Sequence, residues 1–229
     1  MTQTSKTVAV FIPAFNEENS IGEVLEGLKQ IQIIDNIFVI DDGSSDKTYS
    51  IALDKGVTVI KHQINLGGGA ALKTAFTVAL LNGIEYIITL DADNQHNPKE
   101  LPQLLNKMND EVGLLIGSRF LRTNNMKMKR YRSYGIQFFS WLVSKIIKQT
   151  ITDVTSGYRI YNAKDMKRVI NSLNEKQYYA IESLITLAKS NSVIVEEPIQ
   201  DIKREKGKSK KGVLKYVANL LKVVIQTSI

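Results

Sequence analysis

Two carboxylates, an amide and an imidazole stand close together near the middle of this 229-residue chain. They belong to Asp91, Asp93, Gln95 and His96, and they follow the apolar run 86–90, which is typical of a buried strand. Carboxylate and amide oxygens suit a hard divalent cation such as Mg²⁺ or Mn²⁺, which can keep positions open for phosphate oxygens. The alternative is an Asp-rich turn that caps the next helix, and this segment alone does not decide between the two.

The composition of the chain is that of a folded domain without disulfides. Hydrophobic residues make up 43% and charged residues 23%, and the length is enough for one domain with a substantial core. Cysteine is absent, which excludes disulfides and thiolate metal sites and fits a reducing compartment. No signal peptide is recognisable and no apolar run approaches the roughly 20 residues that span a bilayer, so we expect a soluble or peripheral protein.

Strands and helices alternate along the first half of the chain. Uniformly apolar runs at 8–12, 37–40, 57–60, 86–90 and 112–116 predict buried strands, with helical patterns between them. This alternation favours an α/β fold with a mostly parallel central sheet and helices on both faces. Ligands of such sheets bind at the carboxyl ends of the strands, which is where we expect the site.

Acidic residues gather at that expected edge. Asp41 and Asp42 follow the run 37–40, just as Asp91 and Asp93 follow the run that precedes them. Four carboxylates at the ends of two buried strands are hard to explain by structure alone. Their placement favours a cation-binding site over a capping turn.

The glycines at 67–69 argue against two common classes of nucleotide-binding protein. They lack the last glycine of the dinucleotide fingerprint and follow the third predicted strand instead of the first. No Gly-Lys-Ser/Thr follows four variable residues, so a P-loop is missing as well. Hydride transfer and ATP hydrolysis are therefore poor interpretations of this chain.

Two further classes of protein fit the sequence less well than an enzyme that binds a nucleotide through a cation. A nucleotidyltransferase usually has a Gly- and Lys-rich loop after its first strand, where this chain has Pro13-Ala14-Phe15-Asn16-Glu17. A non-catalytic membrane-binding module would use basic helices, but it has no need of acids at the strand ends. Both remain weaker interpretations.

The second half of the chain is basic and less regular. The segment 119–132 contains no acid and runs into an amphipathic, aromatic-rich helix at 134–147. A basic stretch, 203–211, precedes a last amphipathic helix. We expect one domain over residues 1–202, followed over residues 203–229 by a basic loop and a C-terminal amphipathic helix.

Seven short motifs, taken in order over residues 8 to 211, resemble those of the family 2 glycosyltransferases, which have the GT-A fold of nucleotide-diphospho-sugar transferases. The resemblance is closest to the branch of dolichol-phosphate mannosyltransferases and bacterial polyprenyl-phosphate glycosyltransferases. The motifs are Ile12-Pro13-Ala14-Phe15-Asn16-Glu17, Val39-Ile40-Asp41-Asp42-Gly43-Ser44-Ser45-Asp46, Asn65-Leu66-Gly67-Gly68-Gly69, Asp91-Ala92-Asp93-Asn94-Gln95-His96, Gly117-Ser118-Arg119, Thr155-Ser156-Gly157-Tyr158-Arg159 and Arg204-Glu205-Lys206-Gly207-Lys208-Ser209-Lys210. Each motif is weak alone, whereas the ordered set is specific.

The resemblance implies a hexosyltransferase with a nucleotide-sugar donor, UDP- or GDP-linked, and a bound Mg²⁺ or Mn²⁺. Asp91, Asp93 and Gln95 would hold the cation, which offsets charge on the departing nucleoside diphosphate. The implied nucleotide-sugar site consists of Pro13, Ala14, Phe15, Glu17, Asp41, Asp42, Gly69, Asp91, Ala92, Asp93, Gln95, Arg119, Arg204 and Lys210.

Four of the residues are expected to act in catalysis: Asp93, Arg119, Asp153 and Arg204. The two arginines would contact phosphates, because a planar guanidinium binds such groups in bidentate fashion. The alternatives are a surface salt bridge for Arg119 and a solvated basic tail for Arg204 and Lys210.

The acceptor determines whether a base is needed. Transfer to a sugar hydroxyl of a cell-surface polysaccharide or lipid-linked glycan needs one, and Asp153 and Glu182 are the candidates. A polyprenyl phosphate needs none, because a phosphate monoester is largely ionised at neutral pH, and Arg130 and Arg132 would bind that phosphate. We expect a polyprenyl phosphate as the acceptor, and transfer of the sugar with inversion at its anomeric carbon. A turn cap for Asp153 and an exposed helix position for Glu182 are the competing interpretations.

Basic residues lie beside apolar helical faces at two places, 127–142 and within 213–225. Such helices suit an anionic membrane surface, and packing on the core or a homo-oligomer interface is the alternative. We expect a cytoplasmic protein, peripheral at the inner face of the membrane, with no nucleic-acid partner.

Overall fold

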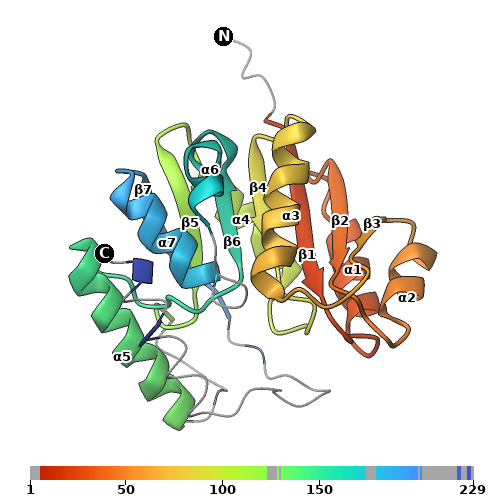
Figure 1. The fold of residues 1–229 in the computed structure, drawn as a ribbon, viewed down its shortest axis with the longest axis horizontal. Helices are drawn as coiled ribbons and strands as arrows, with labels where there is room; N and C mark the ends of the chain where they lie inside the picture. Colours follow the sequence, from red (N-terminus) through yellow and green to blue (C-terminus); the bar gives the residue numbers. More distant parts are fainter. Residues whose placement is uncertain are drawn as a thin grey trace.

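A seven-stranded sheet with helices on both faces forms the body of the computed structural model (Figure 1). The residues that the structure describes are 6–122, 128, 130–173, 179–200, 202, 221–222 and 226–227. The predicted basic loop and nearly all of the predicted C-terminal helix therefore lie outside the described residues.

The strand order in the sheet is β3-β2-β1-β4-β6-β5-β7. The strands are β1 (Val8–Ala14), β2 (Asn36–Asp41), β3 (Thr58–Lys61), β4 (Tyr86–Thr89), β5 (Val112–Ser118), β6 (Arg159–Asn162) and β7 (Val193–Pro198). All five strands predicted from apolar runs are confirmed. The central strands are mostly apolar because both faces of the sheet are covered: in β1, Phe11 packs in one hydrophobic cluster, and Val10 and Ile12 pack in the other. The edge strand β3 is only partly buried, with Thr58 and Lys61 exposed.

Strand β6 is antiparallel to both of its neighbours, whereas the other four pairings in the sheet are parallel. Arg159, the first residue of β6, pairs with Thr89 at the end of β4 and with Ile116 near the end of β5. An antiparallel strand begins at the edge where its parallel neighbours end. The loop before β6 therefore lies at the carboxyl edge, next to the residues that follow β4.

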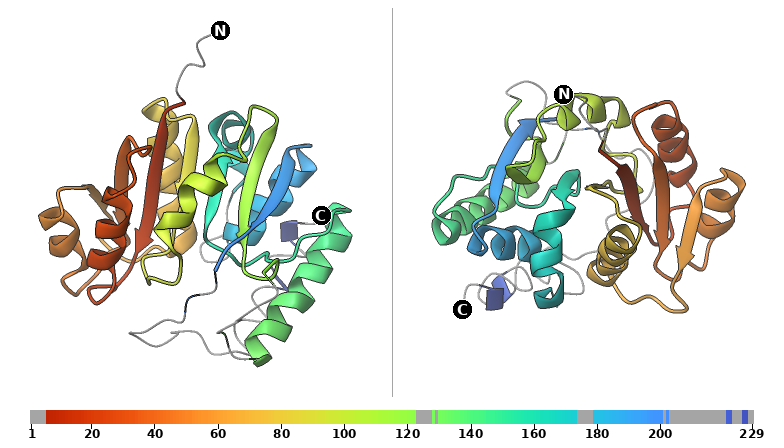
Figure 2. Two further views of the ribbon diagram at one scale, coloured as in Figure 1. Left: turned by 180° about the vertical axis from the view of Figure 1, so that it is seen from behind. Right: turned by 90° about the horizontal axis from the view of Figure 1, so that it is seen from above.

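The helices form two layers, as the alternating pattern predicts. One face of the sheet carries α3, α6 and α7, and the other carries α1 and α4 (Figure 2). The bounds are α1 (Ile21–Lys29), α2 (Thr48–Asp54), α3 (Gly68–Leu81), the 3₁₀ turn η1 (Pro98–Glu100), α4 (Leu101–Leu105), α5 (Arg130–Ile147), α6 (Ala163–Val169), the 3₁₀ turn η2 (Ile170–Ser172) and α7 (Tyr179–Lys189).

Helix α5 stands at the side of the domain, and one of its ends projects beyond the carboxyl edge of the sheet (Figure 1). It is attached through one buried face, which includes Ile136, Phe139 and Val143. Over the described residues, every helix falls short of the length and hydropathy that a bilayer span requires.

Two leucines of helix α3, one buried and one exposed, test how this helix packs on the sheet. Leu72 is fully buried in the core cluster, whereas Leu81 at the end of the same helix is 81% exposed. Leu72→Ala is expected to lower the free energy of unfolding by about 2–5 kcal/mol in urea titrations, through lost burial and a cavity. Leu81→Ala is expected to change it by less than about 0.5 kcal/mol. Equal effects of the two substitutions would contradict this packing.

Candidate active site

The predicted cation motif follows β4 at the lower edge of the sheet in Figure 1. Asp91 is held there from two sides. His96, which is buried, places its Nε2 atom 3.2 Å from Asp91 Oδ2. On the other side, a Cβ atom added to Gly157 would come within 2.5 Å of Asp91 Oδ1. Since 42% of the Asp91 side chain is still exposed, its carboxylate is fixed in place and remains open to a ligand.

Positive charges keep the Asp91 carboxylate ionised. Burial raises the pKa of Asp91, but the hydrogen bond and charge of His96 and the charges of Arg119 and Arg132 outweigh it and lower the pKa below its ordinary value. His96 is therefore the side-chain partner of Asp91, a role that the sequence alone did not predict. Its ring also packs 5.3 Å from the ring of Tyr158.

The other two predicted cation ligands connect the motif to the end of the domain. Asp93 Oδ1 accepts a hydrogen bond from the backbone N–H of Gln95 at 3.1 Å. The Nε2 atom of Gln95 donates to the carbonyl of Ile202 at 3.3 Å. The chain therefore returns to the motif after β7, two residues before Arg204 in the sequence. Arg204 and Lys210 themselves lie outside the described residues.

Asp41 and Asp42, which end β2 and begin the next loop, have different surroundings. Asp42 accepts hydrogen bonds from His62 Nδ1 at 2.8 Å and from the backbone N–H groups of Leu66 and Gly67 at 2.9 and 2.8 Å. It therefore shapes the loop before α3. Asp41 Oδ1 accepts from a backbone N–H, whereas its buried Oδ2 has no hydrogen-bond partner among the described residues.

The remaining predicted nucleotide-sugar residues lie at the same edge of the sheet or close to it. They are Pro13 and Ala14 at the end of β1, Phe15 and Glu17 in the loop that follows, Gly69 in the first turn of α3, and the buried Ala92 after β4. The loops after β1 and β2 are tied together, since the backbone N–H groups of Asn16 and Glu17 donate to hydroxyls of Ser44 and Thr48 at 2.9 and 2.8 Å.

The four acids share one edge but not one cation. Strand β1 lies between β2 and β4 and separates Asp41 from Asp91 by two strand spacings, about 9–10 Å. Within the described part of the chain, no three His, Cys, Asp or Glu side chains form a group that could hold a metal ion. The edge therefore divides into the region of Asp41 and the region of Asp91 and Asp93.

Arg119, at the end of β5, forms a buried ion pair with Asp153. Its Nε and Nη2 atoms donate to the two carboxylate oxygens at 2.7 and 2.9 Å, and Nη2 also donates to Thr155 Oγ1 at 2.9 Å. Burial raises the pKa of Asp153, but the charge and hydrogen bonds of Arg119 outweigh it, so the pKa is lowered. The alternative of a surface salt bridge for Arg119 is wrong, because both partners are buried.

Further side chains hold the loop between α5 and β6, and sequence patterns gave them no role. Glu196 of β7 accepts from the backbone N–H groups of Thr152 and Asp153 at 2.8 and 3.0 Å. Arg159 is fully buried and donates to the carbonyls of Val154 and Ser156 at 3.0 and 2.8 Å. The loop that carries Asp153 and Gly157 is therefore held in place by side chains of two strands, Glu196 of β7 and Arg159 of β6.

The residues predicted to serve the acceptor lie on two helices. Arg130 and Arg132 are exposed in the first turn of α5, and the charge of Arg132 makes a small contribution to the lowered pKa of Asp91. Glu182 lies in the first turn of α7 and is buried, so the alternative of an exposed helix position is wrong.

Comparisons with known proteins agree with this architecture. The sequence model described as glycosyl transferase family 2 matches residues 9–170. An uncharacterised protein of Methanocaldococcus jannaschii is 37% identical, with 96% of this chain and 91% of that protein covered. A UDP-N-acetylglucosamine–dolichyl-phosphate N-acetylglucosaminyltransferase of Methanococcus voltae is 30% identical, with 87% of each chain covered. An undecaprenyl-phosphate mannosyltransferase of Micrococcus luteus is 30% identical, with 89% of this chain and 86% of that protein covered.

A solved structure shares the fold at low sequence identity. The crystal structure of glucosyl-3-phosphoglycerate synthase from Mycobacterium tuberculosis, in complex with Mn²⁺, UDP and phosphoglyceric acid, matches with a TM-score of 0.78 and 17% identity. The match covers 97% of this chain and 78% of that chain. The fold is thus that of the GT-A glycosyltransferases, with acidic residues at the carboxyl edge of a mostly parallel sheet. This chain belongs to glycosyltransferase family 2, which confirms the predicted fold, family and enzyme class.

The ion pair of Arg119 and Asp153 leads to a pH-dependent prediction. At neutral pH, Asp153→Asn is expected to lower the free energy of unfolding by about 3–5 kcal/mol, because it leaves the buried guanidinium without a counter-charge. The lowered pKa of Asp153 means that the ion pair stabilises the fold above the ordinary aspartate pKa of about 4 and that this stabilisation is lost as the pH falls further. The difference between the wild type and the variant should therefore shrink in acid.

Urea titrations over a pH series measure this difference directly. Asp54→Asn, at the exposed end of α2, is the matched control and should change stability by less than about 0.5 kcal/mol. A loss for Asp153→Asn that stayed the same from neutral pH to acid would show that the charge of Asp153 is not what stabilises the fold.

Proposed function

We propose that this glycosyltransferase moves a sugar with inversion from a nucleotide-sugar to a polyprenyl phosphate, at the cytoplasmic face of a membrane. The choice of acceptor rests on the hydrogen bonds that Asp153 makes with Arg119. Both of its oxygens already accept hydrogen bonds from Arg119, so it is poorly suited to take a proton from a hydroxyl. A phosphate monoester is largely ionised at neutral pH and needs no such base. The relatives from M. voltae and M. luteus, whose names specify dolichyl and undecaprenyl phosphate, support the same acceptor class.

The residues after β4 fit a divalent cation such as Mg²⁺ or Mn²⁺. Asp91 is ionised, held in place and partly exposed, and Asp93 follows within two residues. The amide nitrogen of Gln95 is engaged with the carbonyl of Ile202, which leaves its oxygen as the ligand atom. Hard cations of this kind take oxygen ligands and share them with diphosphate and water. When bound, the cation would offset the negative charge that develops on the leaving diphosphate.

The nucleoside is proposed to bind near the end of β2. The buried Oδ2 atom of Asp41 has no hydrogen-bond partner among the described residues, and its ion pair with Lys61 Nζ is long, at 3.8 Å. A ligand N–H that donates to this atom would stabilise the site. Uracil and guanine each present a ring N–H that can do so. Asp42 would act indirectly, through the loop that it holds before α3.

The acceptor phosphate is proposed to bind between the site and the first turn of α5, near Arg130 and Arg132. One of its oxygens attacks the anomeric carbon from the side opposite the diphosphate. The bond from that carbon to the diphosphate oxygen breaks, and the electron pair leaves with the nucleoside diphosphate. The chain's own contribution is to hold both phosphates among arginines while keeping Asp91 ionised.

A transfer assay tests this proposal. The protein is incubated with Mg²⁺ or Mn²⁺, a panel of UDP-, GDP- and dTDP-sugars, and a short, water-soluble polyprenyl phosphate. Mass spectrometry should show a glycosylated lipid phosphate and free nucleoside diphosphate for one donor. Chelation of the metal and Asp93→Ala should each abolish transfer, and full activity after both would rule out the mechanism. Loss of transfer in Glu182→Gln, with nucleotide binding intact, would instead favour a hydroxyl acceptor.

Gly157 provides a separate test of the cation site. In Gly157→Ala the new methyl group would lie 2.5–2.7 Å from the atoms of the Asp91 carboxylate and push it aside. The affinity for Mn²⁺ in the presence of UDP, measured by electron paramagnetic resonance, should fall by about tenfold or more. Gly135→Ala has nothing within 4 Å of the new methyl group and should bind Mn²⁺ as the wild type does. Unchanged affinity in Gly157→Ala would remove Asp91 from the set of ligands.

A further inference from the structure

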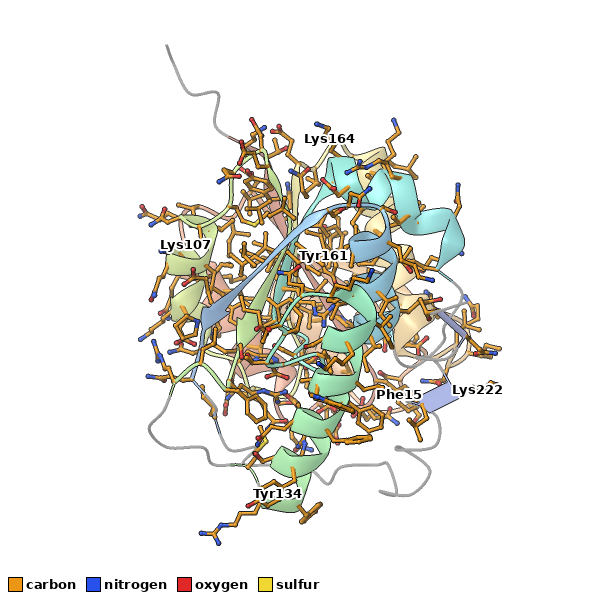
Figure 3. All side chains as sticks on the ribbon, turned by 90° about the vertical axis from the view of Figure 1, so that its left-hand side faces the viewer. Phe15, Lys107, Tyr134, Tyr161, Lys164 and Lys222 are labelled. Carbon is orange, nitrogen blue, oxygen red and sulfur yellow. The ribbon has the colours of Figure 1, made fainter. Side chains whose placement is uncertain are left out.

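The outward face of α5 carries a row of exposed aromatic side chains. Tyr134, Phe138 and Trp141 are 68%, 51% and 57% exposed, although they belong to the types that usually anchor a core. Their spacing of four and three residues places them on one side of the helix. Lys145 continues the same row past the last aromatic ring, and Lys148 follows directly after the helix ends at Ile147. Tyr134 lies at the projecting end of α5 in Figure 3, away from the interior position of Tyr161.

The sequence that contains this helix is one of the two basic segments of the chain. Residues 120–152 contain seven Lys and Arg side chains and no Asp or Glu, which equals the net charge of +7 of the whole chain. Within the described residues, neither Lys145 nor Lys148 forms an ion pair. Both lysines are therefore available to a partner that carries negative charge.

A groove of about 750 Å³ opens beside the two lysines, between α5 and the segment 148–152. The hydroxyls on its floor are already used: Ser140 Oγ donates to the carbonyl of Thr152 at 3.0 Å, and Ser144 Oγ accepts from the backbone N–H of Ile151 at 2.9 Å. The floor is therefore rigid, and the groups left for a ligand are those of the rim, which include Trp141, Lys145 and Lys148.

We propose that this face of α5 docks on an anionic bilayer and that the groove binds the phosphate-bearing headgroup of an anionic phospholipid between Lys145 and Lys148. Aromatic side chains that combine an apolar body with a polar tip settle at the level of the headgroups, and basic side chains beside them attract anionic lipid. The inner face of α5 is already packed on the core, and Leu221 near the end of the chain packs on that same core cluster. Its outer face keeps three aromatic side chains exposed among the described residues, and these are available to an external partner.

The headgroup site is distinct from the proposed acceptor site, although it rests on the proposed function at a membrane. Arg132 and Lys145 are thirteen residues apart on α5, or about 20 Å along its axis, and Lys148 follows just beyond the end of the helix. One end of the helix would therefore lie near the transferred sugar while the other holds a lipid that is not consumed. Docking through both ends would keep the site beside its lipid-linked acceptor between turnovers.

The only tryptophan of the chain lies in this face, so its fluorescence reports on the proposal directly. The full chain is titrated with vesicles of phosphatidylcholine, with and without phosphatidylglycerol. Only the anionic vesicles should shift the emission of Trp141 to shorter wavelength, and brominated acyl chains in them should quench it. The double variant Lys145→Gln/Lys148→Gln should partition about tenfold or more weakly.

The charge-matched control is Lys164→Gln/Lys167→Gln on α6, at the opposite end of the molecule from Tyr134 (Figure 3). It should bind the anionic vesicles nearly as the wild type does, and both double variants should unfold at the wild-type temperature. Equal weakening by the two double variants would mean non-specific charge attraction and would overturn the proposal. An unshifted Trp141 on anionic vesicles, or a shift produced by self-association without vesicles, would overturn it as well.

Transfer to the water-soluble acceptor, measured without vesicles, separates this inference from the proposed function. Lys145→Gln/Lys148→Gln should transfer at the wild-type rate there, because neither lysine belongs to the proposed transfer site. If the wild type failed in that assay but bound anionic vesicles through Trp141, the proposed function would fall and the docking face would stand.

Discussion

The contact between the Asp91 carboxylate and the backbone of Gly157 joins the two halves of the site. The first half consists of the loops after parallel strands, and the second is the loop that enters the antiparallel strand β6. The contact exists because β6 runs between β4 and β5 in the reverse direction and so begins where they end. A glycine is required there, since any Cβ atom would occupy the space of the carboxylate.

That contact depends in turn on a loop held by buried charges. Asp153 is paired with Arg119, Glu196 binds the backbone N–H groups before and at Asp153, and Arg159 is surrounded by carbonyl oxygens. Removing one partner from such a set leaves an uncompensated charge in a low dielectric, so the set behaves as a unit. The arrangement keeps positive charge close to the ionised Asp91 carboxylate, which suits the phosphates that are proposed to bind beside it.

Local patterns were sufficient for the framework of the fold. Apolar runs located the strands, and their alternation with helices predicted the mostly parallel sheet. Side-chain partners far apart in the sequence could not be predicted in this way. The sequence did not predict that the Asp42 carboxylate binds a loop more than twenty residues later, nor that Asp153 pairs with Arg119, 34 residues away. The need for a glycine at 157 likewise depends on a carboxylate in a different loop.

The central claim is that a lipid phosphate oxygen displaces the nucleoside diphosphate directly. The anomeric configuration of the product tests it, because a single in-line displacement must invert the sugar carbon. Proton and phosphorus NMR of the product formed from an α-linked nucleotide-sugar should show a β-linked sugar with its anomeric carbon bound through oxygen to the lipid phosphate. An α-linked product, or a sugar attached to a hydroxyl with no coupling to phosphorus, would contradict the account.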